Sequence, residues 1–305
     1  MKRLLVTGVH GFVGRALARL VSSDPRFSHW QLVVVPESLD LRNVEHATAM
    51  AGISPLDAVI HLAAQSFVPE AFRDPTTTFE INVLGTLNLL QALRAAGFNG
   101  RMIYVGTGDV YGLVDEASLP VAETAIPAPR NPYAVSKLAA EALCRQWSFT
   151  EQMDVMLARP FNHIGWGQSD RFVVSDFARR IVAIKHRRRS AVVEVGDIDV
   201  TRDFTDVDDV VHAYFALLEH GTSGEVYNVC SGREQSIRST LHRLAGLAGV
   251  DVSPKPVAAR LRKAEQRRMC GDSSKIQEAT GWRATTPIDD SLESMLRYWE
   301  TEDNA

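Results

Sequence analysis

The chain has 305 residues, of which 33 are Lys or Arg and 37 are Asp or Glu, so its formal net charge is −4. Hydrophobic residues make up 45% and charged residues 23%, which excludes a disordered, collagen-like or disulfide-dense small protein. The slight acidity argues against a dedicated nucleic-acid-binding protein, and no run approaches the ~20 apolar residues of a membrane span.

The first 160 residues alternate between short apolar runs and helical patterns. The runs predict strands at residues 4–6, 32–35, 58–62, 102–105 and 155–158, and the helices are predicted at 12–21, 77–96 and 133–149. Strands that alternate with helices indicate a parallel sheet covered on both faces. The stretch 77–96 is apolar nearly all the way round, so one side is free for a further contact, such as a second subunit.

Beyond Pro160 the alternation is less regular. We predict helices at 172–186, 237–248, 273–280 and 288–300 and strands at 192–195 and 226–229. The fold class is therefore α/β, a Rossmann-like doubly wound parallel sheet with a small discontinuous α/β substrate-binding domain. The predicted dinucleotide-binding domain is 1–161, with 199–230 returning to it, and the substrate-binding domain is 162–198 and 231–305.

A glycine-rich stretch joins the first strand to the first helix. Gly8, Gly11 and Gly14 allow a tight turn, the close approach of a pyrophosphate to backbone N–H groups, and close packing of the helix on the strand. Between a strand and a helix, this spacing predicts a dinucleotide site. Glu37, after the second strand, can serve a ribose diol or be a solvated loop charge, so the choice between NADH and NADPH stays open.

Tyr133 and Lys137 lie one helical turn apart, after Asn131 and Pro132, which suit the start of a helix. A nearby ammonium stabilises a phenolate and lowers the tyrosine pKa, so we expect this pair to exchange a proton with a carbonyl or hydroxyl. Thr107 follows the strand at 102–105, where it can hydrogen-bond the reacting oxygen or simply form a turn.

Together these motifs resemble the extended short-chain dehydrogenase/reductase family, and the resemblance covers nearly the whole chain. It implies that Tyr133 donates or accepts the proton and that Lys137 also holds the nicotinamide ribose, with Thr107 as the third catalytic residue. It implies NADPH or NADH as the cofactor. The implied cofactor contacts are Gly8, His10, Gly11, Phe12, Val13, Gly14, Asp40, Leu41, Leu62, Ala63, Ala64, Gln65, Asn82, Tyr133 and Lys137.

The second half of the chain resembles the GDP-mannose branch of that family. The matching segments are 161–165, 202–204, 262–265 and 271–275. The resemblance implies a GDP-sugar substrate, because arginine forks suit phosphates and a carboxylate suits a ribose diol. The implied substrate contacts are Asp109, Asn162, Val173, Arg202, Arg262 and Glu265. For Arg262 and Glu265, a surface ion pair is an equal alternative.

Asp109 bears on the reaction within this branch. The 4,6-dehydratases carry a glutamate base there, and an aspartate is one methylene shorter. The resemblance is therefore to the reductases of the branch, which implies reduction of the 4-keto group of GDP-4-dehydro-6-deoxy-D-mannose to GDP-D-rhamnose. The alternatives are a GDP-mannose 4,6-dehydratase, another nucleotide-sugar 4-epimerase or 4-ketoreductase, and, more remotely, a non-catalytic NAD(P)-binding protein.

The three cysteines, Cys144, Cys230 and Cys270, are widely spaced, which suggests neither a disulfide framework nor a metal site and favours a reducing, cytoplasmic setting. The short apolar start ends at Thr7 without a cleavage site, so we predict no signal peptide. We expect neither a nucleic-acid nor a membrane partner. The family resemblance implies a homodimer through a bundle of the helices at 77–96 and 133–149.

Overall fold

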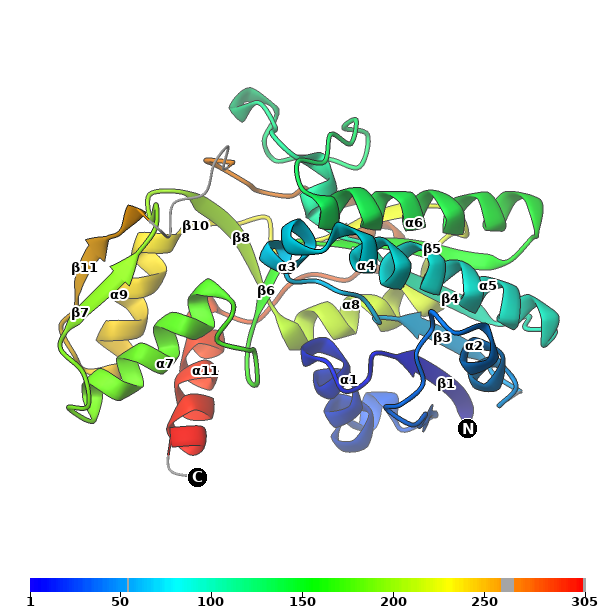
Figure 1. Ribbon diagram of the computed structural model, residues 1–305, viewed down its shortest axis with the longest axis horizontal. Coiled ribbons are helices and arrows are strands. Elements are labelled where there is room, and N and C mark those ends of the chain that lie inside the picture. Colours follow the sequence, from blue (N-terminus) through cyan, green and yellow to red (C-terminus); the bar gives the residue numbers. More distant parts are fainter. Residues whose placement is uncertain (54, 259–265, 304–305) are drawn as a thin grey trace.

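The computed structural model describes residues 1–53, 55–258 and 266–303, arranged as a larger and a smaller part (Figure 1). The larger part is built on a six-stranded sheet in the order β2-β1-β3-β4-β5-β9, in which every pairing is parallel. The prediction of a Rossmann-like parallel sheet is confirmed. Its strands are β1 (Lys2–Thr7), β2 (Trp30–Val33), β3 (Ala58–His61), β4 (Arg101–Val105), β5 (Asp154–Pro160) and β9 (Val226–Val229).

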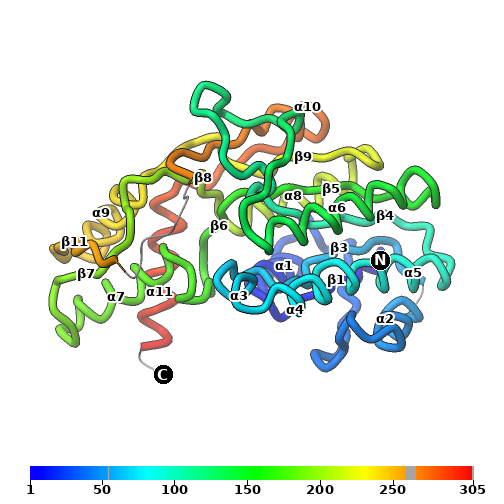
Figure 2. The backbone as a smooth tube through the Cα atoms, turned by 45° about the horizontal axis from the view of Figure 1, so that its top comes forward, coloured from blue at the N-terminus to red at the C-terminus, as the bar shows by residue number. Residues whose placement is uncertain are grey.

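Helices cover both faces of this sheet, as Figure 2 shows from a second direction. Along β1, Leu4 and Val6 belong to the core on one face and Leu5 to the core on the other, which explains why the strands read as continuous apolar runs. The first core includes α1 (Phe12–Ser23), α8 (Val207–His220) and α10 (Ser274–Thr280). The second includes α2 (Val44–Ala51), α5 (Gly85–Ala95) and α6 (Pro132–Thr150).

The stretch 77–96, predicted as one helix, is interrupted. α4 (Pro75–Phe79) is followed by a π-helical turn, η2 (Glu80–Leu84), and then by α5. The turn contains the buried Asn82, whose amide accepts from the Gln65 N–H (2.8 Å) and donates to the Gln65 carbonyl (3.0 Å) and Ser136 Oγ (2.9 Å). These bonds offset the less favourable geometry of a π turn, which is found frequently at functional sites.

The smaller part contains two short sheets. One has three strands in the order β10-β8-β6 and the other pairs β11 with β7. Its strands are β6 (Asn162–Ile164), β7 (Val192–Val195), β8 (Thr201–Asp206), β10 (Glu234–Ser236) and β11 (Ser253–Pro256). Its helices are α7 (Val173–Lys185), α9 (Ile237–Ala248) and α11 (Ile288–Asp303). Their apolar faces form a separate core.

The returning segment 199–230 adds α8 and β9 to the larger part, but β8 does not join the six-stranded sheet. It lies between β6 and β10 instead, because its Thr201–Asp203 pair with Ser236–Glu234 and its Phe204–Asp206 with Asn162–Ile164. The division into two domains thus stays a prediction. Among the described helices, none is long and apolar enough to cross a membrane.

Shorter elements complete the larger part: α3 (Val68–Arg73) and the 3-10 turns η1 (Pro25–Phe27), η3 (Gly108–Tyr111) and η4 (Glu116–Ser118). The strand order reverses between β1 and β3. Ligands of open α/β sheets bind beside the carboxyl ends of the strands at such a reversal. Thr7 and His61 end these two strands, so a ligand site is expected beside them.

Candidate functional site

The glycine loop has the geometry that a dinucleotide needs. Gly8 has φ +73°, and a Cβ there would lie 2.8 Å from the backbone nitrogen of Ala63. A Cβ on Gly14 would lie 2.4 Å from the Gly8 carbonyl oxygen. Gly11 caps α1 without a side-chain hydrogen bond, and the first turn of α1 has no acidic residue. The helix N-terminus can therefore present its N–H groups to a diphosphate, and the loop fits a nicotinamide dinucleotide.

The start of α1 is also tied to the smaller part. Arg15 donates to the His10 carbonyl (2.9 Å) and to the Gly167 carbonyl (2.9 Å). The rings of Phe12 and His163 stack at 5.9 Å between centroids, 5° from parallel. His163 Nδ1 donates to the Phe161 carbonyl (3.0 Å), and burial lowers the pKa of His163. Sequence reasoning did not single out Arg15, and it included His163 only within the matching segment 161–165.

A buried histidine holds the ends of β1 and β3 together. His61 Nδ1 lies 2.6 Å from Thr7 Oγ1, and its Nε2 lies 2.9 Å from Thr86 Oγ1. Because the Thr86 hydroxyl donates to the Asn82 carbonyl (2.7 Å), Nε2 carries the proton, and Nδ1 accepts from Thr7. Thr7 Oγ1 also accepts from the Ala63 N–H (3.2 Å). Burial, and then the Lys137 charge, lower the pKa of His61 to about 3, so the ring is neutral.

The loop after β3 carries four of the predicted cofactor contacts. Leu62, Ala63, Ala64 and Gln65 are all partly buried beside the glycine loop and η2. Gln65 accepts from the Phe67 N–H (2.6 Å) and donates to Thr78 (3.1 Å). With the bonds of Asn82 to Gln65 and Ser136, this network connects β3, α4, η2 and α6 beneath the predicted catalytic residues.

Thr107, Tyr133 and Lys137 come together as the sequence predicted. Asn131 caps α6 by accepting from the Ala134 N–H (2.8 Å), which sets the start of the helix just before Tyr133. The Thr107 side chain hydrogen-bonds Tyr133 and accepts from the Asp109 N–H (3.2 Å). Lys137 is buried one turn further along α6, where its ammonium lies 4.6 Å from the centre of the Tyr104 ring.

The pKa of Tyr133 differs from what we expected. Instead of being lowered by Lys137, it is raised, because burial and the negative charge of Asp109 outweigh the hydrogen bond from Thr107. Burial lowers the pKa of Lys137 to about 8, against the opposing effects of Cys144 and Glu141. Tyr133 therefore keeps its proton near neutral pH.

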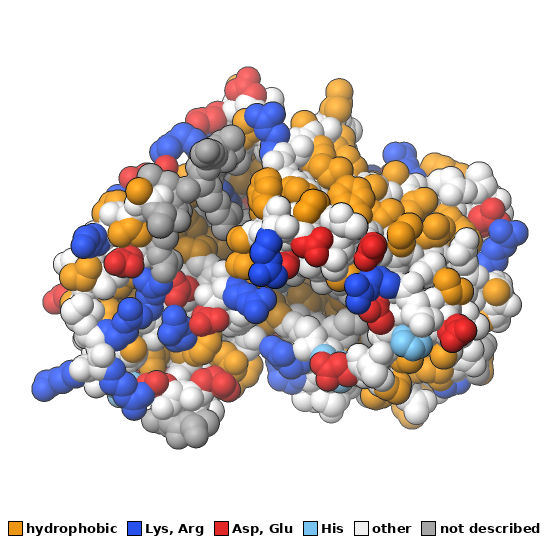
Figure 3. Space-filling model, viewed as in Figure 1, with side chains coloured by type: hydrophobic (Ala, Val, Ile, Leu, Met, Phe, Trp, Pro, Cys, Tyr) orange, Lys and Arg blue, Asp and Glu red, His pale blue; other side chains and the backbone are white. Residues whose placement is uncertain are grey.

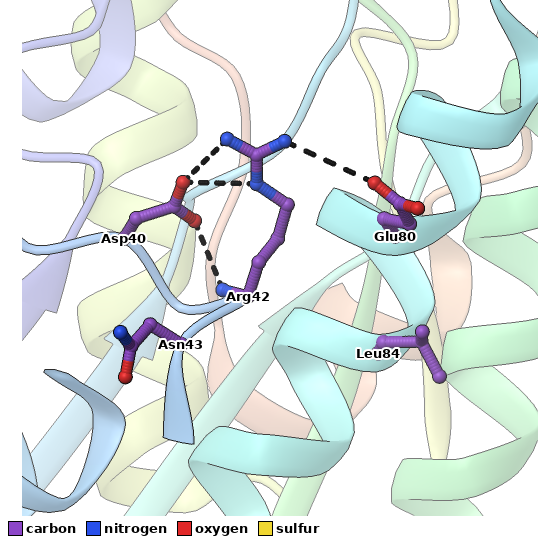
Figure 4. A pocket seen from close by; sticks show the side chains of 5 residues that line it. All are labelled: Asp40, Arg42, Asn43, Glu80 and Leu84. Atoms are coloured by element: carbon purple, nitrogen blue, oxygen red, sulfur yellow. Dashed lines mark hydrogen bonds and ion pairs between the residues drawn. The ribbon is translucent and has the colours of Figure 1, made fainter. Parts of the chain in front are cut away.

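Asp40, a predicted cofactor contact, lines a pocket together with Arg42, Asn43, Glu80 and Leu84 (Figure 4). Arg42 donates to the Asp40 carboxylate (2.6 and 2.9 Å) and lies 3.9 Å from Glu80. The Arg42 guanidinium lowers the pKa of Asp40. The side chain of Leu41 belongs to the core, and its contact with the cofactor stays a prediction.

The predicted substrate residues lie on several elements. Asn162 begins β6, Val173 begins α7 and Asp109 lies on η3, and all three residues are exposed. Arg202, on β8, donates to the carbonyls of Thr201 (2.7 Å) and Gln266 (2.9 Å). Arg262 and Glu265 lie outside the described residues. Figure 3 shows a hollow where the two parts meet, with Lys and Arg side chains beside it.

Among residues 1–53, 55–258 and 266–303, no group of three or more His, Cys, Asp or Glu side chains is placed to hold a metal ion.

Comparisons with known proteins agree with this geometry. The model of the family described as GDP-mannose 4,6 dehydratase matches residues 37–295. GDP-6-deoxy-D-mannose reductase of Pseudomonas aeruginosa is 52% identical over 98% of both chains. GDP-6-deoxy-D-talose 4-dehydrogenase of Aggregatibacter actinomycetemcomitans is 28% identical over 92% of this chain and 91% of the relative. The solved structure of RMD from Pseudomonas aeruginosa complexed with NADPH has a TM-score of 0.93 and 51% identity, over 99% of this chain and 100% of that one.

Proposed function

The chain belongs to the GDP-mannose 4,6-dehydratase family, within the extended short-chain dehydrogenases/reductases, and from this we propose that it reduces GDP-4-dehydro-6-deoxy-D-mannose to GDP-D-rhamnose. It is thus a nucleotide-sugar 4-ketoreductase, an oxidoreductase that uses NADPH or NADH. The similarity to a GDP-6-deoxy-D-mannose reductase supports the substrate.

The catalytic residues act at the keto oxygen of the sugar. When bound, the reduced nicotinamide supplies the hydride that carbon 4 receives. Tyr133 donates its proton to the oxygen as negative charge develops there, and Thr107 steadies the tyrosine hydroxyl through its hydrogen bond. Lys137 holds the nicotinamide ribose. Acid–base help of this kind is worth roughly 10²–10⁴ in rate.

The cofactor residues are proposed on the loop geometry described above. Gly8, Gly11 and Gly14 give a diphosphate access to the N-terminus of α1. We propose that Asp40 lies near the adenine and that Leu62, Ala63 and Ala64 line the nicotinamide side, with Gln65 and Asn82 as further cofactor contacts. At the substrate end, Asp109 contacts the sugar, and Asn162, Val173 and Arg202 hold the GDP portion.

The raised pKa of Tyr133 favours reduction, as does the 52% identity to a GDP-6-deoxy-D-mannose reductase. A ketoreductase needs a proton donor at the start of its cycle. A 4-epimerase or 4,6-dehydratase begins by removing a proton from a sugar hydroxyl, which calls for a tyrosinate. Because burial and Asp109 both raise the pKa of Tyr133, the residue enters the cycle as an acid. A non-catalytic NAD(P)-binding protein would need no such donor.

The decisive experiment supplies enzymatically made GDP-4-dehydro-6-deoxy-D-mannose with NADPH or NADH and identifies the product by NMR. We expect cofactor oxidation, with GDP-D-rhamnose formed in equal amount, and the two rates show which cofactor is preferred. A parallel reaction contains GDP-mannose alone. Conversion of GDP-mannose to a 4-keto sugar without added reductant would overturn the reductase assignment in favour of a dehydratase.

We propose further that the protein is a homodimer formed through the exposed face of α4, η2 and α6. Phe79, Leu84, Val135 and Phe149 are exposed along these elements, and hydrophobic side chains gather over this region in Figure 3. A second copy is the partner that suits a face continuous along two neighbouring helices. Light scattering should give twice the chain mass, and Val135→Glu with Phe149→Glu should give the monomer. A monomeric parent protein would refute the dimer.

A reducing, cytoplasmic location is also proposed. Cys144, Cys230 and Cys270 are all buried free thiols, which suits a compartment where disulfides do not form. Fractionation of cells should place the protein with the cytoplasmic enzymes, and recovery with exported proteins would contradict this location. We propose no nucleic-acid or membrane partner.

A further inference from the structure

A buried ion pair lies directly behind the catalytic lysine. Glu141 follows Lys137 by one turn of α6, and its carboxylate binds Arg159 of β5 through two bonds, from Nε (2.9 Å) and Nη2 (2.6 Å). Both residues are buried, with 5% of Glu141 and 4% of Arg159 exposed. Removing these two charges from water costs free energy, which only hydrogen bonds of good geometry offset. The groups that bond to the pair therefore have little freedom to move.

Arg159 extends this pair to the turn that carries Thr107 and Asp109. Its Nη1 donates to the Tyr111 hydroxyl (2.9 Å), and its guanidinium lies 4.9 Å from the centre of the Tyr111 ring. Tyr111 is the last residue of η3 and is 1% exposed. Since Arg159 donates to this oxygen, the Tyr111 O–H donates onward to Asn228 Oδ1 (2.7 Å).

Asn228, on β9, reaches the two chain segments that cross above the sheet. Its amide donates to the carbonyls of Val121 (3.0 Å) and Asp272 (3.2 Å). These segments bind each other, because Val121 donates to the Cys270 carbonyl (2.9 Å) and Asp272 donates to the Val121 carbonyl (2.9 Å). The network thus ends on residues 270–272.

A second connection joins the same regions. The Gln266 side chain accepts from the Val114 N–H (3.0 Å) and donates to its carbonyl (3.0 Å), and the Gln266 carbonyl accepts from Arg202 (2.9 Å). The segment 266–272 is therefore bonded to Arg202, proposed above to hold the GDP portion. The same segment is hydrogen-bonded to the residues that follow η3, directly at Val114 and through Asn228 at Val121.

We propose that Tyr111 and Asn228 are positioning residues that couple the 266–272 segment, at the nucleotide end of the substrate, to the Thr107–Tyr111 turn at its reacting end. The inference rests on the proposed function. When the GDP portion is bound, the 266–272 segment becomes more rigid. The Tyr111–Asn228 and Gln266–Val114 hydrogen bonds then restrict the positions of Thr107 and Asp109 as well. Part of the binding energy of the GDP portion is then used at carbon 4, where it raises kcat.

The test compares Tyr111→Phe with Tyr227→Phe. Tyr227 lies next to Asn228 on β9, is also buried, and its hydroxyl likewise takes part in a hydrogen bond, accepting from the Thr222 N–H (2.9 Å). We expect Tyr111→Phe to lower kcat about 10- to 100-fold with KM for the keto sugar changed less than about threefold, because displacement of reacting groups acts mainly on kcat. Tyr227→Phe should keep the kcat of the parent.

Hydrogen exchange with GDP as the probe supplies a readout that does not depend on turnover. GDP should slow exchange of the amides between Thr107 and Gly112 in the parent and in Tyr227→Phe, but not in Tyr111→Phe. Gln266→Ala breaks the second connection at a partly exposed residue, so it guards against a failure of Tyr111→Phe to fold. It should lower kcat in the same sense and weaken the GDP effect.

The outcomes separate the two proposals. If the parent reduces the keto sugar but Tyr111→Phe and Gln266→Ala match Tyr227→Phe in kcat and exchange, the coupling is refuted and the function stands. Equal loss of cofactor affinity, KM and kcat in Tyr111→Phe would also refute it, since that indicates general loosening of the fold. If the parent neither binds GDP nor reduces the sugar, the proposed function fails, and the coupling fails with it.

Discussion

The hydroxyl of Tyr133 has two neighbours that act on its proton in opposite directions. Burial raises the pKa of Tyr133 most, the Asp109 carboxylate raises it further by destabilising the phenolate, and the hydrogen bond from Thr107 opposes both. Asp109, proposed above to contact the sugar, thus also raises the pKa of Tyr133.

Removal of the Tyr133 hydroxyl tests the role of this residue as proton donor. Tyr133→Phe should lower kcat by roughly 10²–10⁴ because it removes the proton donor. Dissociation constants for NADPH and GDP, measured by calorimetry, should stay within about threefold, since the ring and the helix start remain. Turnover equal to that of the parent would show that another group supplies the proton.

His61 predicts a pH dependence of stability. Its pKa is about 3 in the folded chain and 6.5 as the ordinary value, so the unfolded chain binds a proton that the folded chain excludes between these values. Stability from this group is therefore present above pH 6.5 and is lost as the pH falls toward 3. Between pH 6.5 and 5 the loss is about 2 kcal/mol, at 1.36 kcal/mol per pH unit.

Urea unfolding at pH 6.5 and pH 5 measures this loss, with His61→Gln as the matched variant. Gln keeps a donor and an acceptor for Thr7 and Thr86 but does not titrate. The parent should lose about 2 kcal/mol more than His61→Gln over this range. Equal losses in the two proteins would mean that His61 is protonated in the folded state.

At the scale of single elements, the glycine loop and α1 depend on close backbone contacts. A Cβ on Gly14 would lie 2.4 Å from the Gly8 carbonyl and 2.5 Å from Val9, all backbone atoms, so the helix would have to move away from the loop. At Gly246, in α9, no atom lies within 4 Å of the added Cβ. The two positions form a matched pair of helical glycines.

Gly14→Ala should weaken NADPH binding at least about tenfold and lower the unfolding free energy by 1–3 kcal/mol, roughly the cost of overpacking. Gly246→Ala should instead raise the unfolding free energy by about 0.4–1 kcal/mol and leave NADPH binding unchanged. Fluorescence titration and urea unfolding measure both. Normal NADPH affinity in Gly14→Ala would contradict the close-contact geometry of the loop.

The elements that sequence predicted well are those with strong apolar periodicity. The strands at 192–195 and 226–229 and the helix at 237–248 have the predicted bounds. α8 was missed, although Asp206 caps it and its apolar residues repeat at helical spacing. The short strands β6 and β10 are largely polar, so no apolar alternation reveals them.

Within the site, the motif residues were predictable because they lie close in sequence to recognisable elements. The π turn at Glu80–Leu84 was not, since an all-round apolar helix tolerates an extra residue without changing its pattern. The raised pKa of Tyr133 depends on Asp109, which belongs to another element, and the Arg15–Gly167 contact spans 152 positions. Such relations follow only from tertiary packing.

At the scale of the whole molecule, one carboxylate binds the two chain segments that connect the larger and the smaller part. Asp203, on β8, is fully buried and accepts from the N–H groups of Ser231 (2.9 Å), Gly232 (3.0 Å) and Gly271 (3.2 Å), and from the Ser231 hydroxyl (2.5 Å). Burial raises the pKa of Asp203, and these donors oppose that rise. It thus fixes two chain segments that run from one part to the other.

Asp203→Asn should lower the unfolding free energy by about 2–4 kcal/mol, because an amide nitrogen replaces one acceptor among N–H donors. The exposed Asp199, paired with Arg238 (2.8 Å), provides the control, and Asp199→Asn should cost clearly less, because an exposed ion pair contributes little to stability. Urea unfolding measures both. An Asp203→Asn protein as stable as Asp199→Asn would show that the Asp203 carboxylate does not stabilise the connecting segments.

The position of β9 at the edge of the large sheet has a consequence for synthesis on the ribosome. β5 is complete at Pro160, but the strand that covers its outer edge starts only at Val226, after the chain has passed through β6, α7, β7, β8 and α8. During that interval the nascent protein presents a row of unpaired backbone groups from a strongly apolar strand, open to pairing with other chains. The β5 edge of the large sheet is therefore paired, and protected from pairing with other chains, only after much of the smaller part has been translated.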